Sequence, residues 1–316
     1  MENITRKEAI KEVEEIMSKG EVPVVSLDLF DSLKEIQISE KVENQLLYTL
    51  ELCSDFAKEL QRYSKDFQEK YLSALRKSDI IDNQAIEKED SFLISLYYSM
   101  NSDFAIDKLM QNVGSPLDRA KFISYHDLLI TGSSSQNKKG LREDNLKFVG
   151  EYVTNPETLK TERKICYFPI DYRNIDSAIE AFLDFYNKNI PENAEHMNII
   201  KPIVVHGLVA TLQLFKDGNT RYGRLLQTVG LWEALNKELN IDFDLPFVYG
   251  TRQYASVRGE YRALVNNLAC NADAKAWEDW ILFNFRKLQD CIFYNEYNMQ
   301  KLTSLLHAEK TDKPKL

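Results

Sequence analysis

Residues that break helices are scarce along this chain, and that scarcity constrains its fold more than any other feature. Its 316 residues include only 11 glycines and 8 prolines, whereas chains rich in β-structure need many turn residues. From residue 39 to about residue 76, apolar residues recur every three or four positions, as Leu46, Leu50 and Cys53 do. This is the spacing of one helix face. We therefore expect an all-α fold of long helices, forming one large domain, alone or with an accessory segment.

Charge and patterning exclude several classes of protein. The formal net charge of −9 argues against nonspecific binding to nucleic acid, which needs a basic surface. No apolar run approaches the ~20 residues that span a bilayer, and the N-terminus lacks the basic-then-apolar layout of a secretion signal. The four cysteines show no Cys-x-x-Cys pairing, which favours buried free thiols in a reducing compartment. We expect a cytoplasmic protein with no membrane or nucleic-acid partner.

Residues 213–224 carry the candidate chemistry. Asp217, Gly218 and Asn219 are turn residues, because glycine has no steric penalty at positive φ, and Asn and Asp tolerate it. Helical spacing follows from residue 220, so the free N–H groups of a helix start point back at the turn and attract anions. Arg221 and Arg224 lie on nearly one face, where both can hold phosphate oxygens. The Asp217 carboxylate suits Mg²⁺. We interpret this stretch as a magnesium-nucleotide or other polyphosphate site; an ordinary capped helix is the alternative.

The same stretch resembles the motif of the Fic (Fido) family, His-Pro-Phe-x-Asp/Glu-Gly-Asn-Gly-Arg-x-x-Arg. The matching positions are Phe215, Asp217, Gly218, Asn219, Arg221 and Arg224. Two positions depart from the motif: Gln213 replaces its histidine, and Thr220 replaces its second glycine. Weaker similarities flank it at residues 123–129, 140–142, 202–212, 260–264 and 277–283. The resemblance therefore covers roughly residues 35 to 285.

The resemblance implies a Fic-type helical domain with a small β-hairpin flap and an N-terminal helical extension. The expected parts are an N-terminal helical region over residues 1–110, a core domain over residues 111–290, and a C-terminal helix and tail over residues 291–316. Gly140 and Arg142 match the flap segment, where target proteins of this family dock by strand addition. An ordinary surface loop with a small sheet is the alternative for this segment.

The resemblance also implies transfer of AMP from ATP to a protein hydroxyl, with ATP and Mg²⁺ as cofactors. The implied nucleotide contacts are Gly218, Asn219, Thr220, Arg221, Arg224 and Tyr261, and the implied metal ligand is Asp217. Gln213 stands in the position of the catalytic base, but an amide has no useful basicity. Loss of a general base costs roughly 10²–10⁴ in rate. His206 lies about two helical turns earlier and is interpreted as a core histidine; nothing in the sequence brings His126 near the loop.

A second signature of the family, Ser/Thr-x-x-x-Glu-Gly/Asn, matches Ser39, Glu43 and Asn44. In the family it marks an autoinhibitory helix, here residues 39–52, whose glutamate pairs with the last arginine of the motif. The resemblance therefore implies that Glu43 occupies Arg224 and blocks the γ-phosphate, because a carboxylate replaces phosphate in the guanidinium fork. Alternatively, Ser39 caps an ordinary helix and Glu43 is solvated.

Two classes of function remain open. The first is an autoinhibited nucleotide-binding protein with weak or absent transferase activity, or a transferase with a different phosphate-containing donor. The second is a regulatory pseudoenzyme that binds a nucleotide or a partner without chemistry. Gln213 favours weak or absent transfer, whereas the two arginines favour ligand binding. Thr220 either alters the shape of the pocket or simply caps the helix. A homo-oligomer is compatible with either class.

Overall fold

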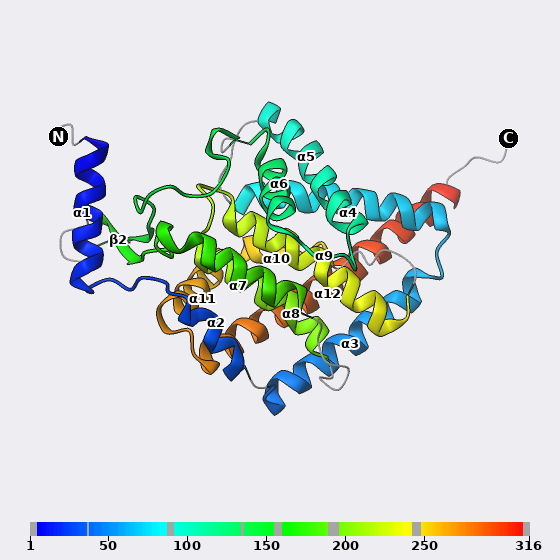
Figure 1. The fold of residues 1–316 in the computed structure, drawn as a ribbon. Coiled ribbons are helices and arrows are strands. Elements are labelled where there is room, and N and C mark those ends of the chain that lie inside the picture. Colours follow the sequence, from blue (N-terminus) through cyan, green and yellow to red (C-terminus); the bar gives the residue numbers. More distant parts are fainter. Residues whose placement is uncertain are drawn as a thin grey trace.

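Helices dominate the fold, and the described residues contain a single two-stranded sheet. The computed structural model describes residues 5–36, 38–86, 92–133, 136–154, 160–188, 196–241 and 248–311. Figure 1 shows the elements, which are α1 (Arg6–Lys19), α2 (Asp28–Asp31), η1 (Ser32–Glu35), α3 (Glu40–Leu60), α4 (Lys65–Ile86), α5 (Phe92–Gln111), α6 (Arg119–Ile130), η2 (Gln136–Lys138), β1 (Val149–Thr154), β2 (Thr161–Tyr167), η3 (Tyr172–Asn174), α7 (Ile175–Asn187), α8 (Met197–Leu212), α9 (Asn219–Leu239), α10 (Thr251–Ser256), α11 (Arg258–Asn271) and α12 (Ala274–Thr311). The expected all-α fold with a small hairpin is confirmed.

Local signals set several helix ends. Thr5 and Glu8 form a capping box at the start of α1, and Gly20 ends that helix in the left-handed conformation. The Ser39 side chain accepts a hydrogen bond from the Val42 N–H at the start of α3. Such caps satisfy N–H groups that have no partner inside the helix. These boundaries are therefore readable from a few neighbouring residues.

The core is built around α8 and α9, which form an antiparallel helix pair. Every residue of α8 from Pro202 to Leu212 is buried. A Cβ atom on Gly223 of α9 would lie 2.9 Å from the His206 ring. One on Gly230 would lie 2.8 Å from the Pro202 ring. The two glycines thus let the helices approach closely, and this packing fixes the loop of residues 213–218 between them.

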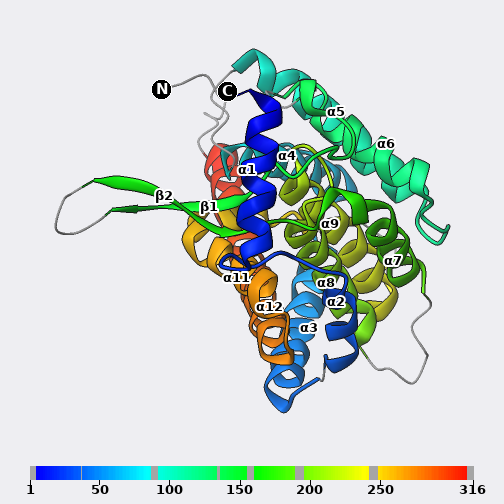
Figure 2. The ribbon, with the colours of Figure 1, turned by 60° about the vertical axis from the view of Figure 1, so that its left-hand side comes forward.

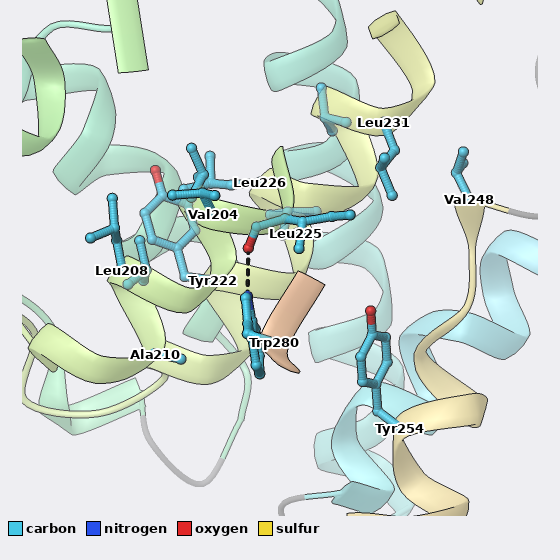
Figure 3. Close-up of a cluster of buried hydrophobic side chains, with 14 of the residues drawn as sticks. Val204, Leu208, Ala210, Tyr222, Leu225, Leu226, Leu231, Val248, Tyr254 and Trp280 are labelled. Carbon is cyan, nitrogen blue, oxygen red and sulfur yellow. Dashed lines mark hydrogen bonds between the residues drawn. The ribbon is translucent and has the colours of Figure 1, made fainter. Parts of the chain in front are cut away.

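A cluster of buried side chains joins this helix pair to α10 and α12 (Figure 3). Trp280 of α12 is fully buried, and its indole N–H donates to the Ile203 carbonyl oxygen at 2.8 Å. Val204 and Leu208 of α8 and Tyr254 of α10 are part of the same cluster. Burying a large apolar side chain stabilises the fold by about 1.5–3 kcal/mol. The helix pair that holds the loop is therefore anchored from several sides.

Two of the N-terminal helices, α3 and α4, pack on this core. The Tyr63 and Thr303 hydroxyls, 3.1 Å apart, join the turn after α3 to α12. α4 lies against α5 and α10. The antiparallel β1–β2 hairpin extends from the helical body, and α1 lies beside its base (Figures 1 and 2).

Two helices extend beyond the segment boundaries expected from the sequence. The helix expected over residues 39–52 continues as α3 to Leu60, and α12 runs through residue 290, where a boundary was expected. The expected tail beyond residue 311 lies outside the described residues. Cys53 and Cys291 are buried as expected, whereas Cys166 is half-buried and Cys270 is exposed. Within the described residues, no helix has both the length and the apolarity needed to cross a membrane.

Candidate functional site

The loop between α8 and α9 is a tight turn held by two residues at positive φ. Gln213 ends α8 with φ 51°, and Gly218 precedes α9 with φ 77°. A Cβ atom on Gly218 would lie 2.5 Å from Ile130 and 3.2 Å from His126. Glycine is therefore required at this position by both conformation and space. The start of α9, a 21-residue helix, points its free N–H groups toward the loop.

Asn219 holds the loop in shape through both ends of its side-chain amide. Its Oδ1 accepts from the Phe215 N–H at 2.8 Å, and its Nδ2 donates to the Phe215 carbonyl oxygen at 2.9 Å. The side chain is buried. The predicted nucleotide contact Asn219 therefore acts within the loop here, while Thr220 lies half-buried in the first turn of α9.

Gln213 stands at the motif position of the catalytic base, but its side chain turns back on α8. The amide Nε2 donates to the Ala210 carbonyl oxygen at 2.7 Å, and the residue is buried. Its backbone oxygen accepts from Arg142 Nε at 2.6 Å. Because a carboxamide is not basic, Gln213 serves as a cap for the end of α8 and takes no proton.

The predicted flap residues join the flap to this loop. The Arg142 guanidinium is buried and also donates to the Ile170 carbonyl oxygen, and the Arg142 N–H donates to the Leu214 carbonyl oxygen at 3.1 Å. Burial lowers the pKa of Arg142 to about 10, which leaves it charged at neutral pH. Gly140 has φ 80°, and its carbonyl oxygen accepts from the Lys216 N–H at 3.1 Å. Both residues thus fix the flap relative to the loop.

Asp217, the predicted metal ligand, lies among positive charges. Its Oδ2 is 3.1 Å from Lys138 Nζ, its Oδ1 accepts from the Gly218 N–H at 2.7 Å, and Arg221 Nη2 is 3.8 Å from Oδ1. Burial opposes ionisation of Asp217, but Lys147, the Gly218 N–H and Lys138 outweigh it and lower the pKa to about 2. Mg²⁺ is commonly held by one or two carboxylates together with substrate phosphates and water. Asp217 would supply one such carboxylate, and Lys138 lies beside its Oδ2.

Arg224 is buried and held by α4. Its Nε donates to Asn83 Oδ1 at 2.7 Å, and its Nη1 lies 3.5 Å from the Tyr261 hydroxyl. Beside it, the buried Asp79 carboxylate accepts from the Thr251 N–H at 2.6 Å and the Thr251 hydroxyl at 3.0 Å. Burial raises the pKa of Asp79 to about 6, although Thr251 and Arg224 oppose the rise.

The space next to Arg224 is small. Two cavities border it, with volumes of about 20 and about 10 Å³, whereas pockets for small ligands measure ~300–1,000 Å³. Each has room for no more than about one water molecule. A triphosphate reaches Arg224 only if α4 moves.

The predicted pair of Glu43 with Arg224 is wrong. Glu43 and Asn44 are exposed on α3, which packs along α12, and among the described residues no ion pair joins Glu43 to Arg224. Ser39 caps α3, which matches the alternative interpretation. Within the described residues of the N-terminal helices, a hydrogen bond to Arg224 comes from Asn83 of α4. The sequence contains a signal for this contact. Ser78, Asp82 and Asn83 repeat the spacing of the inhibitory signature, with Asp in place of Glu.

Tyr261 and His206 support Arg224 from the opposite side. The His206 Nδ1 and Gln227 Oε1 are hydrogen-bonded, which leaves Nε2 to accept from the Tyr261 hydroxyl at 2.9 Å. Burial and then the Arg224 charge lower the pKa of His206 to about 3, so the ring is neutral at pH 7. His206 is a core histidine, as expected. Tyr261, a predicted nucleotide contact, is buried and positions Arg224.

His126 reaches the loop, which the sequence did not reveal. Its Nε2 is 2.7 Å from the Asp217 carbonyl oxygen, its Nδ1 is 3.0 Å from Asp127 Oδ1, and its ring stacks on Phe215 with centroids 3.7 Å apart. The same Asp127 oxygen accepts from the Gly140 N–H at 2.9 Å. His126 and Asp127 thus link the loop to the flap, across a sequence separation of 91 residues that no local pattern spans.

Comparison with known proteins gives one family match and several similar folds. Residues 116–231 match the model of the Fic/DOC family. The fold is similar to a Fic family protein from Desulfovibrio desulfuricans, with TM-score 0.57 and 16% identity over 84% of this chain and 76% of that chain. It is also similar to a Fic domain-containing signalling protein from Bacteroides thetaiotaomicron (TM-score 0.51, 10% identity, 78% and 97% covered) and to Fic-1 from C. elegans (0.50, 14%, 84% and 74%). No curated protein matches the chain.

Proposed function

We propose, from the match of residues 116–231 to the Fic/DOC family model, that the chain binds nucleotide phosphates at the α8–α9 loop while transferring AMP weakly or not at all. The observation that carries the proposal is the position of Gln213, whose amide is buried and bonded to Ala210. The acceptor hydroxyl then has no base at this position. The expected loss is roughly 10²–10⁴ in rate, the usual contribution of a general base.

The loop keeps the features that bind phosphate. Gly218 allows the tight turn, and the start of α9 directs its N–H groups and dipole toward it. Arg221 lies in the first turn of α9, and Arg224 follows one turn later. Guanidinium groups make charge-assisted bonds to phosphate oxygens. A nucleotide is the ligand class that suits both this chemistry and the family.

α4 is the inhibitory element of the proposal. Asn83 accepts from Arg224 Nε, so a phosphate oxygen gains that N–H only after the Asn83 amide leaves. A neutral amide is a weaker partner for a guanidinium than a phosphate. We therefore expect a nucleotide to displace α4 at a cost in affinity, and Asn83→Ala to remove that cost.

The β1–β2 hairpin is the proposed docking edge for a target protein. Two-stranded sheets leave backbone groups unpaired along both outer edges, and the flap is fixed to the loop through Arg142. Addition of a protein substrate should slow amide hydrogen exchange in residues 149–154 or 160–167. Exchange that is unchanged when the substrate is saturating would contradict docking here.

The decisive experiment uses ATP radiolabelled on its α-phosphate and calorimetry with unlabelled ATP. We expect no labelling by the natural chain and self-labelling by the Gln213→His, Asn83→Ala double variant. Asn83→Ala alone should bind ATP about tenfold more tightly, the effect of about one hydrogen bond to a charged group. Glu43→Gly is the control, since Glu43 is exposed on α3, and it should behave as the natural chain.

Other outcomes separate the alternatives. Labelling by the natural chain would contradict the role given to Gln213 and support an active transferase. If Asn83→Ala does not bind ATP, a nucleotide is excluded as the ligand, and a pseudoenzyme that binds only a partner protein is favoured. Labelling by the double variant with a donor other than ATP would redefine the donor and keep the site.

A further inference from the structure

Asp79 joins α4 to the start of α10 through hydrogen bonds between buried polar groups. Its Oδ1 accepts from the Thr251 N–H at 2.6 Å, and its Oδ2 accepts from the Thr251 hydroxyl at 3.0 Å. Asp79 lies one helical turn before Asn83 on the same face of α4, and Asn83 accepts from Arg224. The Asp79–Thr251 contact therefore holds in place the part of α4 that must leave before a phosphate gains the Arg224 Nε–H.

The Asp79 carboxylate is buried, and both of its hydrogen bonds come from neutral groups. The residue is 8% exposed, and within the described part of the chain no lysine or arginine forms an ion pair with it. A charge in such a place is costly, whereas a protonated carboxyl is not. The protonated form can keep both bonds, because one oxygen still accepts from the Thr251 N–H and the new O–H can donate to the Thr251 hydroxyl. Docking of α4 is therefore favoured when Asp79 is neutral.

The space beside this contact is polar and incompletely filled. A cavity of about 10 Å³ has polar residues of α4, α5, α9 and α10 in its lining, namely Asp79, Asn83, Ser102, Arg224, Thr228 and Thr251. The Ser102 hydroxyl is buried, and no described residue forms a hydrogen bond with it. A polar and loosely packed junction costs less to separate than a close-packed apolar one. The C-terminal half of α4 is therefore the part of this helix that can open.

We propose that the Asp79–Thr251 contact makes access of a nucleotide to Arg224 depend on pH, because α4 stays docked when Asp79 is protonated and separates more easily when it is ionised. The inference rests on the proposed function, since it concerns the element that covers the same site. The regulating species is a proton, which Asp79 takes up when α4 docks.

Groups on the adjoining helices act on Asp79 in opposite directions. Burial raises the pKa of Asp79 to about 6; Thr251 and the Arg224 charge oppose this rise, and the Asp82 charge adds to it. Other charged or titratable groups near the junction are Arg76 of α4, which pairs with Asp103 and Asp107 of α5, Arg252 of α10, Lys287 of α12, which pairs with Asp290, and the Cys291 thiol of α12. All of these are present in both the natural chain and Asp79→Asn, so comparing the two proteins at each pH isolates Asp79.

The direction of the pH dependence follows from the two states of α4. The pKa of Asp79 is about 6 while α4 is docked and returns toward 3.8 when the carboxyl meets water. The advantage of docking is therefore complete below pH 3.8 and is lost as pH rises through 6. Relative to a variant without this charge, ATP should bind about tenfold more tightly at pH 8 than at pH 5, and the gain should level off above about pH 7.

The test measures Kd for ATP by isothermal titration calorimetry at pH 5, 6, 7 and 8. The Kd of Asp79→Asn divided by that of the natural chain should rise about tenfold over this range, and protonation of ATP itself cancels in the ratio. Asp79→Ala also lacks the titrating group and should give the same pH profile. Glu69→Gln removes an exposed carboxylate from the same helix, and its ratio should stay within about twofold of one at every pH.

Amide hydrogen exchange of the ligand-free proteins follows α4 without a nucleotide. In residues 76–86, the exchange rate of the natural chain relative to Asp79→Asn should rise by about the same factor from pH 5 to 8. Residues 65–72 should exchange equally in the two proteins, because the Tyr71 hydroxyl donates to Asn295 Oδ1 of α12 at 2.9 Å and anchors that half of the helix. Far-ultraviolet circular dichroism and thermal melting verify that each variant folds.

The outcomes separate this inference from the proposed function. A Kd ratio that is constant from pH 5 to 8, or one that changes as much for Glu69→Gln, would overturn the inference and leave the proposed function intact. If ATP binds at no pH, even to Asn83→Ala, the proposed function is wrong. Exchange in residues 76–86 then decides the role of Asp79, and a pH-independent rate ratio would overturn it as well.

Discussion

Asp79 is the residue whose charge is most at odds with its surroundings. It is buried, and burial raises its pKa from 3.8 to about 6. The folded state therefore binds its proton more tightly than the unfolded state, so this contribution to stability is complete below pH 3.8 and is lost as pH rises through 6. A shift of this size corresponds to about 3 kcal/mol. We expect Asp79→Asn to remove that loss.

The measurement is the free energy of unfolding by urea between pH 4 and 8 for the natural chain and for Asp79→Asn. The difference between the two should grow in favour of the variant from pH 4 to about 6 and then level off. Asp66→Asn, an exposed change in the first turn of the same helix, is the matched control. A constant difference across this pH range would show that Asp79 is charged at no cost.

The close packing of α8 against α9 depends on a glycine at residue 223. A Cβ atom on Gly223 would meet the His206 ring at 2.9 Å and the His206 carbonyl oxygen at 3.0 Å. Backbone cannot yield as a flexible side chain does, so Gly223→Ala should push the helices apart and cost about 1–3 kcal/mol of unfolding free energy. Gly259→Ala in α11 is the control, because nothing lies within 4 Å of its added Cβ. It should be neutral or stabilising by up to ~1 kcal/mol, and equal effects in urea titrations would contradict the close-packing argument.

The elements themselves were predictable, but their partners in space were less so. Helix starts at Thr5 and Ser39 depend on residues three positions away, and the turn at Gly218 depends on its own φ. The contact of Asn83 with Arg224 joins residues 141 positions apart. Two segments carried nearly the same inhibitory spacing, and only packing decides that α4, rather than α3, lies against α9. The lysines on Asp217 were missed for the same reason, because Lys138 is 79 positions away.

Across the whole molecule, the four cysteines differ in their exposure to solvent. Cys53 of α3 and Cys291 of α12 lie in the core of the protein, and burial raises the pKa of both thiols well above the ordinary range. Cys166 of β2 is half-buried and Cys270 at the end of α11 is exposed. The exposure of a thiol and the fraction present as thiolate control its reaction with alkylating reagents. We expect the folded protein to react at Cys270 and Cys166 only, and at all four positions after unfolding.

The readout is mass spectrometry of peptides after brief alkylation of the native protein. The Cys166→Ser, Cys270→Ser double variant should show no native labelling yet keep the thermal midpoint of the natural chain to within a few degrees, since Cys270 is exposed and Cys166 packs only partly buried against the core. Labelling of Cys53 in the native state would mean that α3 opens from α12 on the time scale of the reaction. Because α12 also carries Trp280, which packs on α8, such opening would loosen the support of the α8–α9 loop itself.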